Sequence, residues 1–172
     1  MEKRTILIVD DDNYIRSLYS EVFKNYGFEV LEAVDGKAGL DLVLSKKPDV
    51  VFTGIMMPNM TGFELLKTLK ENPETKNIPV LINSHLGKDE DRRKAAELGA
   101  ADFLVKGLIT PKEIVETVSM IFDRKVYRVE LDMAKLDAQK LAGDLGLGDF
   151  FIEIVPDPKG NKKISANIIE RK

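Results

Sequence analysis

Short runs of apolar, often β-branched residues alternate five times with amphipathic stretches over residues 1–122, and this alternation limits the possible folds more than any other feature. Such runs are typical of strands that are buried on both faces, and the stretches between them carry apolar residues at helical spacing. Strands that alternate with helices form a parallel sheet covered on both sides, so the sequence predicts a doubly wound α/β domain. The expected strands are 6–9, 28–33, 50–53, 80–82 and 103–105, and the expected helices are 15–27, 37–44, 63–69, 89–98 and 111–122.

Residues 123–172 do not continue this alternation and are expected to form a second, smaller β-rich α+β module. Residues 150–155 and 164–169 are apolar and β-branched and flank a polar segment with prolines and a glycine, which predicts a β-hairpin. Residues 126–131 favour a strand by composition, yet a seven-residue apolar repeat through the same region also suits a helix that continues as a coil. Two arrangements therefore stay open: a β-α-β-β module, or an extension of the fifth helix followed by the hairpin.

Composition excludes several classes of function. The chain has no cysteine, which excludes disulfides and thiolate chemistry, and its single histidine, His85, excludes a multi-histidine metal centre. The formal charge is −3, so bulk charge favours neither nucleic acid nor an anionic membrane as a partner. The sequence contains no apolar stretch long enough to cross a membrane and no signal-peptide pattern, and we therefore expect a cytoplasmic protein.

Polar residues gather where the predicted strands end. Asp10, Asp11 and Asp12 follow the first strand, Ser84 ends the fourth and Lys106 follows the fifth. The carboxyl ends of parallel strands lie at one edge of the sheet, where open α/β sheets place their functional sites. Clustered carboxylates need a cation beside them, and Mg²⁺ is the divalent ion that carboxylates and water hold most readily. One aspartate is expected to cap the next helix, but capping does not explain Ser84 and Lys106.

Several spaced motifs resemble the receiver domain of two-component response regulators. They are Ile6-Leu7-Ile8-Val9-Asp10-Asp11, the loop Ile55-Met56-Met57-Pro58-Asn59-Met60-Thr61-Gly62, Ile78-Pro79-Val80-Leu81-Ile82 with Ser84, and Gly99-Ala100 through Phe103-Leu104-Val105-Lys106. The resemblance covers residues 1–122 and implies a flavodoxin-like sheet of five parallel strands. Residues 123–172 resemble no known output domain.

The resemblance also implies a mechanism. In this family a phosphoryl group passes from a histidine kinase to an aspartate at the end of the third strand, where Mg²⁺ and a lysine stabilise it. Carried onto this sequence, Asp10 and Asp11 occupy the acidic, metal-binding positions and Lys106 that of the lysine. Ser84 takes the position of the hydroxyl that reports phosphorylation, and Phe103 that of the aromatic switch residue.

Gly54 occupies the position of the phosphate acceptor, directly before Ile55-Met56-Met57-Pro58. Glycine supplies neither a nucleophilic oxygen nor a carboxylate for a metal. We therefore expect no catalytic residue, weak Mg²⁺ binding at most, and an ion pair between Lys106 and Asp10 or Asp11.

Two further positions depart from the family. Gly107 follows the lysine where receivers usually have a proline after a cis peptide bond, and we expect a trans bond here because a cis bond before a non-proline residue costs ~2.5–4 kcal/mol. His85 follows the switch hydroxyl, where a small residue is common, and is expected to narrow the mouth of the pocket.

These features predict a degenerate receiver that is not an enzyme and that signals by protein contact without phosphorylation. The fourth helix, fifth strand and fifth helix would supply a docking or dimerising face. The expected partners are other signalling proteins, such as a histidine kinase or a downstream effector, and a second copy of the chain in a homodimer. Nucleic acid and membranes are not expected partners.

Three alternatives stay open. The acceptor could have moved to Thr53 or to one of residues 10–12, although a strand should point Thr53 to the opposite face of the sheet. Gly54 could be an engineered replacement in a phosphorylatable regulator. Residues 123–172 could be a DNA-binding output domain, because residues 141–147 resemble part of a helix-turn-helix. Against this, residues 123–172 hold ten basic and nine acidic residues, and no basic face is evident.

Overall fold

The structure is a computed structural model that describes the backbone of residues 3–123, 126–132, 150–155 and 163–170, and the side chains of residues 3–122. The chain divides into two compact units, Met1–Ser119 and Met120–Lys172, which are described separately. Within the described ranges, no helix combines the length and the apolar character that crossing a membrane requires.

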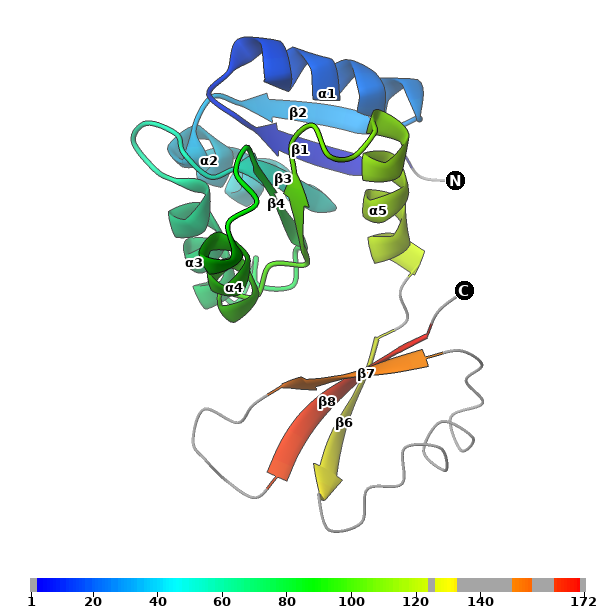
Figure 1. The fold of residues 1–172 in the computed structure, drawn as a ribbon. Coiled ribbons are helices and arrows are strands. Elements are labelled where there is room, and N and C mark those ends of the chain that lie inside the picture. Colours follow the sequence, from blue (N-terminus) through cyan, green and yellow to red (C-terminus); the bar gives the residue numbers. More distant parts are fainter. Residues whose placement is uncertain (1–2, 124–125, 133–149, 156–162, 171–172) are drawn as a thin grey trace. The chain divides into compact units, whose positions relative to one another are not determined.

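The first unit is built around a sheet of five parallel strands in the order β2-β1-β3-β4-β5 (Figure 1). Each neighbouring pair runs parallel, and this order is that of flavodoxin-like sheets. The predicted fold class is therefore confirmed. The strands are β1 (Thr5–Val9), β2 (Glu29–Ala33), β3 (Val50–Gly54), β4 (Val80–Ser84) and β5 (Asp102–Val105).

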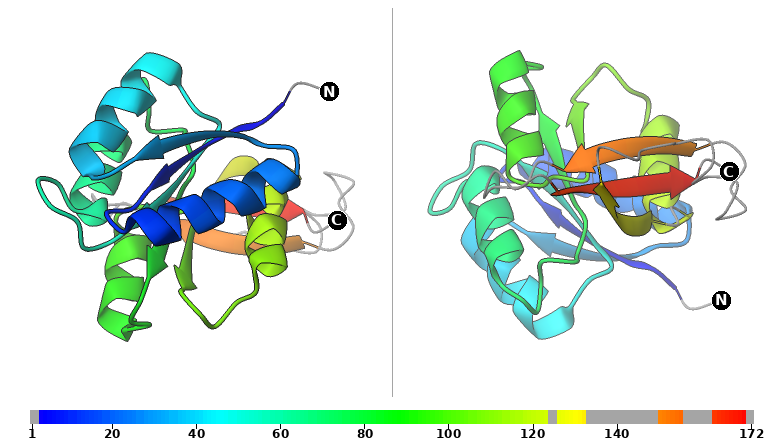
Figure 2. Two further views of the ribbon diagram at one scale, coloured as in Figure 1. Left: turned by 90° about the horizontal axis from the view of Figure 1, so that it is seen from above. Right: turned by 90° about the horizontal axis from the view of Figure 1, so that it is seen from below.

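A helix follows each strand, and the helices cover both faces of the sheet (Figures 1 and 2). Their ends are set by local chemistry: Asp12 caps the first helix, and Thr61 and Glu64 form a reciprocal capping box at the start of the third. Gly27 adopts a φ of +89°, a left-handed conformation that suits glycine, directly after the first helix has ended. The helices are α1 (Asn13–Asn25), α2 (Gly36–Lys46), α3 (Gly62–Glu71), α4 (Asp89–Glu97) and α5 (Pro111–Asp123).

Apolar packing on the two faces of the sheet holds the strands in register. On one face, Tyr19 and Phe23 of α1 meet Phe52 of β3 edge-on, with ring centroids 5.0 and 5.9 Å apart. On the other, leucines of α3 pack against Val9 and Val51 in the main core. All residues of β3 and β4 are buried, so the carboxyl ends of the central strands are fixed at one edge of the sheet.

The second unit contains a three-stranded antiparallel sheet in the order β6-β8-β7 (Figure 1). Its strands are β6 (Val126–Asp132), β7 (Phe150–Val155) and β8 (Lys163–Glu170). β7 and β8 pair as the expected hairpin would, with Ile152 opposite Ile168. Because α5 ends at Asp123 and residues 126–132 pair with β8, the alternative of a continuous helix is wrong. The helix expected between β6 and β7 lies outside the described residues.

Candidate functional site

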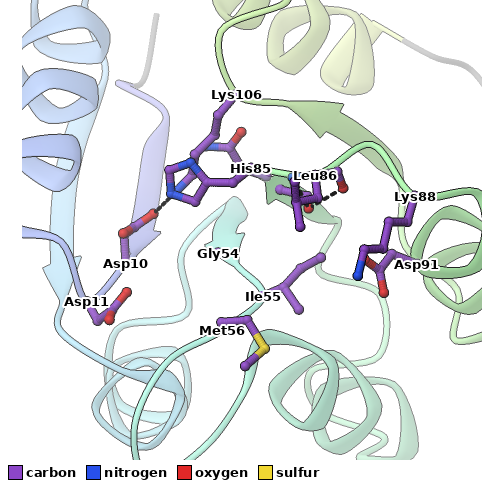
Figure 3. A pocket seen from close by; sticks show the side chains of 12 residues that line it. Asp10, Asp11, Gly54, Ile55, Met56, His85, Leu86, Lys88, Asp91 and Lys106 are labelled. Atoms are coloured by element: carbon purple, nitrogen blue, oxygen red, sulfur yellow. Dashed lines mark hydrogen bonds and ion pairs between the residues drawn. The ribbon is translucent and has the colours of Figure 1, made fainter.

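The carboxyl ends of β1, β3, β4 and β5 surround one pocket with a volume of about 220 Å³ (Figure 3). Of the six residues that the sequence placed at this edge, five line it: Asp10, Asp11, Gly54, Ser84 and Lys106. The sixth, Asp12, caps α1 instead. The other lining residues are Ile55, Met56, Asn83, His85, Leu86, Lys88 and Asp91.

Lys106 forms an ion pair with Asp10 across the floor of this pocket. The Nζ atom of Lys106 lies 2.5 Å from Oδ2 of Asp10, and the two side chains are 8% and 5% exposed. The other carboxylate oxygen, Oδ1, accepts the backbone N–H of Asp12 at 3.1 Å. Both oxygens of Asp10 are therefore engaged, and of the two carboxylates expected to pair with Lys106 it is Asp10 that does so.

The connection between β1 and α1 is held by side chains that bond its backbone. The Asp12 carboxylate accepts two backbone N–H groups of the first turn of α1, at 2.8 and 3.3 Å. Arg16 donates to the carbonyl of Asp10 at 2.8 Å and to the side chain of Asn13 at 2.7 Å. Among the described residues, the exposed carboxylate of Asp11 makes no hydrogen bond or ion pair, so it remains available to a ligand.

Gly54 leaves open the space beside the Asp10–Lys106 pair. A Cβ atom at this position would lie 3.2 Å from Oδ2 and 3.6 Å from Cγ of Asp10. A side chain here would thus point at the ion pair, which is where the family resemblance places the phosphate acceptor. The fully buried Thr53 donates its hydroxyl to the carbonyl of Gly54 at 3.0 Å. That hydroxyl lies 3.2 Å from the Cβ position of Gly62, outside the pocket lining, as the alternation of a strand predicts.

Ser84 and His85 occupy the wall of the pocket that follows β4. The Ser84 hydroxyl donates to the carbonyl of Leu86 at 2.7 Å and accepts its N–H at 3.2 Å, so it is engaged within its own turn. Nε2 of His85 lies 3.3 Å from Nζ of Lys106 and can accept from that ammonium when Nε2 carries no proton. Every peptide bond in the described residues is trans, including the one before Gly107, which confirms the expectation for that turn.

Phe103, the expected switch aromatic, does not line the pocket. It is buried in the main core together with Ile82, its neighbour across β4 and β5. The guanidinium carbon of Arg92, from α4, lies 4.9 Å from the centre of its ring. Packing in the main core and the guanidinium of Arg92 hold the Phe103 ring in this buried position.

Asn83 lines the same pocket and was not identified from the sequence. Its side chain is 2% exposed, and neither polar atom of its amide has a hydrogen-bond partner among the described residues. Burial raises the pKa of Tyr19, the nearby Asn83 amide opposes this shift, and the charge of Asp10 adds to it. Both residues sit in otherwise apolar patterns, and no sequence signal connects them.

The donor set does not fit a tightly bound Mg²⁺ ion. Of the two carboxylates assigned to the metal, Asp10 is already bonded to Lys106 and to a backbone N–H, which leaves Asp11. Among the side chains of residues 3–122, no three or more acidic or histidine groups are placed so as to hold a metal. A third carboxylate at position 54 would complete such a group, and glycine does not supply it.

Comparison with known proteins gives one consistent result. Residues 6–119 match the family model of the response regulator receiver domain. The phosphate regulon transcriptional regulatory protein PhoB of Pseudomonas aeruginosa is 31% identical over 124 residues, which are 72% of this chain and 54% of that protein. The response regulator PleD of Caulobacter vibrioides is 38% identical over 102 residues, which are 59% of this chain and 22% of that protein.

Solved structures agree with the sequence comparison. The chemotaxis protein CheY4 of Vibrio cholerae superposes with a TM-score of 0.66 at 29% identity and covers 70% of this chain and 99% of its own. The chain spans about half the length of the PhoB relatives that it matches. Its similarity to CheY4 covers nearly all of that protein.

Proposed function

The chain belongs to the response regulator receiver family of two-component signalling proteins, and we propose that its receiver signals by protein contact without being phosphorylated. It would then act as a binding module rather than as an enzyme. Its partners would be other signalling proteins, such as a histidine kinase or a downstream effector.

The geometry at Gly54 is the observation that supports this proposal. Phosphoryl transfer to a receiver needs a carboxylate oxygen at the end of β3, and the backbone position that would carry it faces the Asp10–Lys106 pair without a side chain. The lysine that would stabilise an acyl phosphate is already neutralised by Asp10. We also propose that Mg²⁺ binds weakly at most, because Asp11 is the carboxylate of the expected pair that remains free.

Treatment of the full chain with acetyl phosphate and Mg²⁺, followed by intact-mass measurement, tests this proposal. We expect no added phosphoryl group on the native chain or on Gly54→Ala, and one on Gly54→Asp. The alanine variant is the matched control because it adds a Cβ without a carboxylate. A phosphoryl group on the native chain would contradict the proposal, and peptide mapping would show whether one of residues 10–12 had accepted it.

We further propose that the chain forms a homodimer and that the second unit contributes to it. β6 and β7 are the edge strands of the described three-stranded sheet, and the edges of such a sheet can pair with another chain. A unit of this size buries little surface by itself, which favours association. Light scattering at increasing chain concentration should give twice the monomer mass, and a monomer at every concentration would refute dimerisation.

Nucleic acid is not part of the proposed function, although some relatives are named as transcriptional or DNA-binding regulators. If residues 123–172 contained a helix-turn-helix, residues 150–155 would form its recognition helix, but the structure has strand β7 there. The tail also has nearly balanced charge rather than a basic excess. Salt-dependent retardation of duplex DNA by the full chain would contradict this part of the proposal.

A further inference from the structure

The four most exposed large apolar side chains of the first unit lie at the carboxyl edge of the sheet, and two of them line the Gly54 pocket. Met56 and Leu86, which line the pocket, are 78% and 60% exposed (Figure 3). Tyr14 in the first turn of α1 and Leu108 in the β5–α5 connection, at the same edge of the sheet, are 73% and 78% exposed. By contrast, α4 carries no large apolar residue at all. Exposed apolar residues grouped in this way mark a surface that binds a partner.

The interior of the pocket differs from its edge because it favours a cation. Three carboxylates and two ammonium groups line it, and the Lys106–Asp10 pair is neutral as a unit. The carboxylate of Asp11 has no partner among the described residues, and the nearby Asn83 amide oxygen is an acceptor without a donor. An anion would meet the unpaired Asp11, whereas a cation with several N–H donors would satisfy it.

We propose that this pocket receives an arginine side chain from a partner protein, with Met56 and Leu86 packing around it. The planar guanidinium can give Asp11 two parallel hydrogen bonds, and its remaining N–H groups face the interior of the pocket. The volume of about 220 Å³ is many times the ~10–15 Å³ that one water molecule needs, so the pocket has room for a side chain. An arginine anchor in a pocket enclosed by apolar contacts is a common arrangement at the centre of protein interfaces.

The absence of a side chain at position 54 is what makes this site possible. An aspartate there would point at the ion pair and fill the space that the guanidinium would take. The proposal rests on signalling by protein contact, and it locates the contact at the carboxyl edge of the sheet rather than on the charged surface of α4.

An NMR titration of the full, ¹⁵N-labelled chain at low salt tests the proposal. The probe is N-butylguanidinium, and butylammonium and butyrate are the comparison ligands. We expect saturable shifts at the backbone amides of Asp11, Gly54 and Met56, the tightest binding for the guanidinium and none for butyrate. Preferential binding of butyrate, or equal binding of all three probes, would overturn the proposal.

Variants separate the site from general charge effects. Asp11→Asn should weaken N-butylguanidinium at least about tenfold, because it removes a charge-assisted pair, and its exposed side chain makes no contact on which folding depends. Asp41→Asn, an exposed acid on α2, is the matched control and should leave binding unchanged. Equal binding by both variants would refute the role of Asp11.

Two further outcomes are informative. If the same amides shift when the chain is concentrated without any probe, the occupant is a second copy, and the proposal of a different partner is wrong. If the native chain takes no phosphoryl group and also fails to bind the guanidinium, the arginine site is refuted while signalling by contact stands.

Discussion

Replacement of Lys106 by methionine should destabilise the first unit strongly. The Lys106–Asp10 pair is less than a tenth exposed, so removal of the ammonium leaves the Asp10 carboxylate without its partner in a poorly solvated position. Loss of one member of such a pair costs ~3–5 kcal/mol, and we expect about 3 kcal/mol because the adjoining pocket opens to solvent. Lys112→Met is the matched control: Lys112 pairs with Glu116 in a pair that is more than half exposed, and its loss should cost less than ~0.5 kcal/mol.

Urea unfolding followed by tyrosine fluorescence measures this difference, because three of the four tyrosines lie in the first unit. The double variant Asp10→Asn with Lys106→Met should lose less stability than the sum of the single variants, with a coupling energy of ~1–3 kcal/mol. Equal losses for Lys106→Met and Lys112→Met would show that the contact contributes nothing and would refute the reasoning.

Two further predictions concern the loop and helix start that follow β3. A Cβ at Gly62 would overlap the carbonyl oxygen of Gly54, so Gly62→Ala should lower the free energy of unfolding by at least ~2 kcal/mol. Gly54→Ala should be tolerated. Thermal unfolding measures both variants, and equal melting temperatures would contradict this prediction. Hydrogen bonds from the backbone and hydroxyl of Thr61 lower the pKa of Glu64. The Glu64 carboxylate therefore stabilises the fold above its unfolded-state pKa, and this contribution is lost as the pH falls through the lower folded-state pKa. The difference in unfolding free energy between the native chain and Glu64→Gln should disappear in acid. A difference that stays constant with pH would refute the role of this carboxylate.

Much of the fold could be predicted because the residues that set it act locally. The run Val50–Gly54 is buried on both sides, and such runs identify central strands wherever they occur. Asp12 could be expected as a cap because an aspartate directly before a helical pattern has its partners within the next three residues. Position 54 could be identified because the motif that follows it has a fixed spacing.

The remaining features depend on contacts between distant parts of the chain. Lys106 pairs with Asp10 rather than Asp11, and because 96 residues separate the two partners no local pattern in the sequence identifies the pair. Ser84 lines the pocket, but its hydroxyl bonds Leu86 within its own turn, which depends on the path of the β4–α4 connection. The sequence of residues 126–132 is compatible with a helix and with a strand, and its pairing with β8 determines that it forms a strand.

Fluorine NMR of the full chain with beryllium fluoride and Mg²⁺ tests the central claim most directly, because this phosphoryl mimic attaches to the acceptor carboxylate of a receiver. We predict that the native chain shows only the resonances of free fluoroberyllate species, and that Gly54→Asp shows additional, bound resonances. Bound resonances with the native chain would mean that another side chain serves as acceptor, and signalling without phosphorylation would be contradicted.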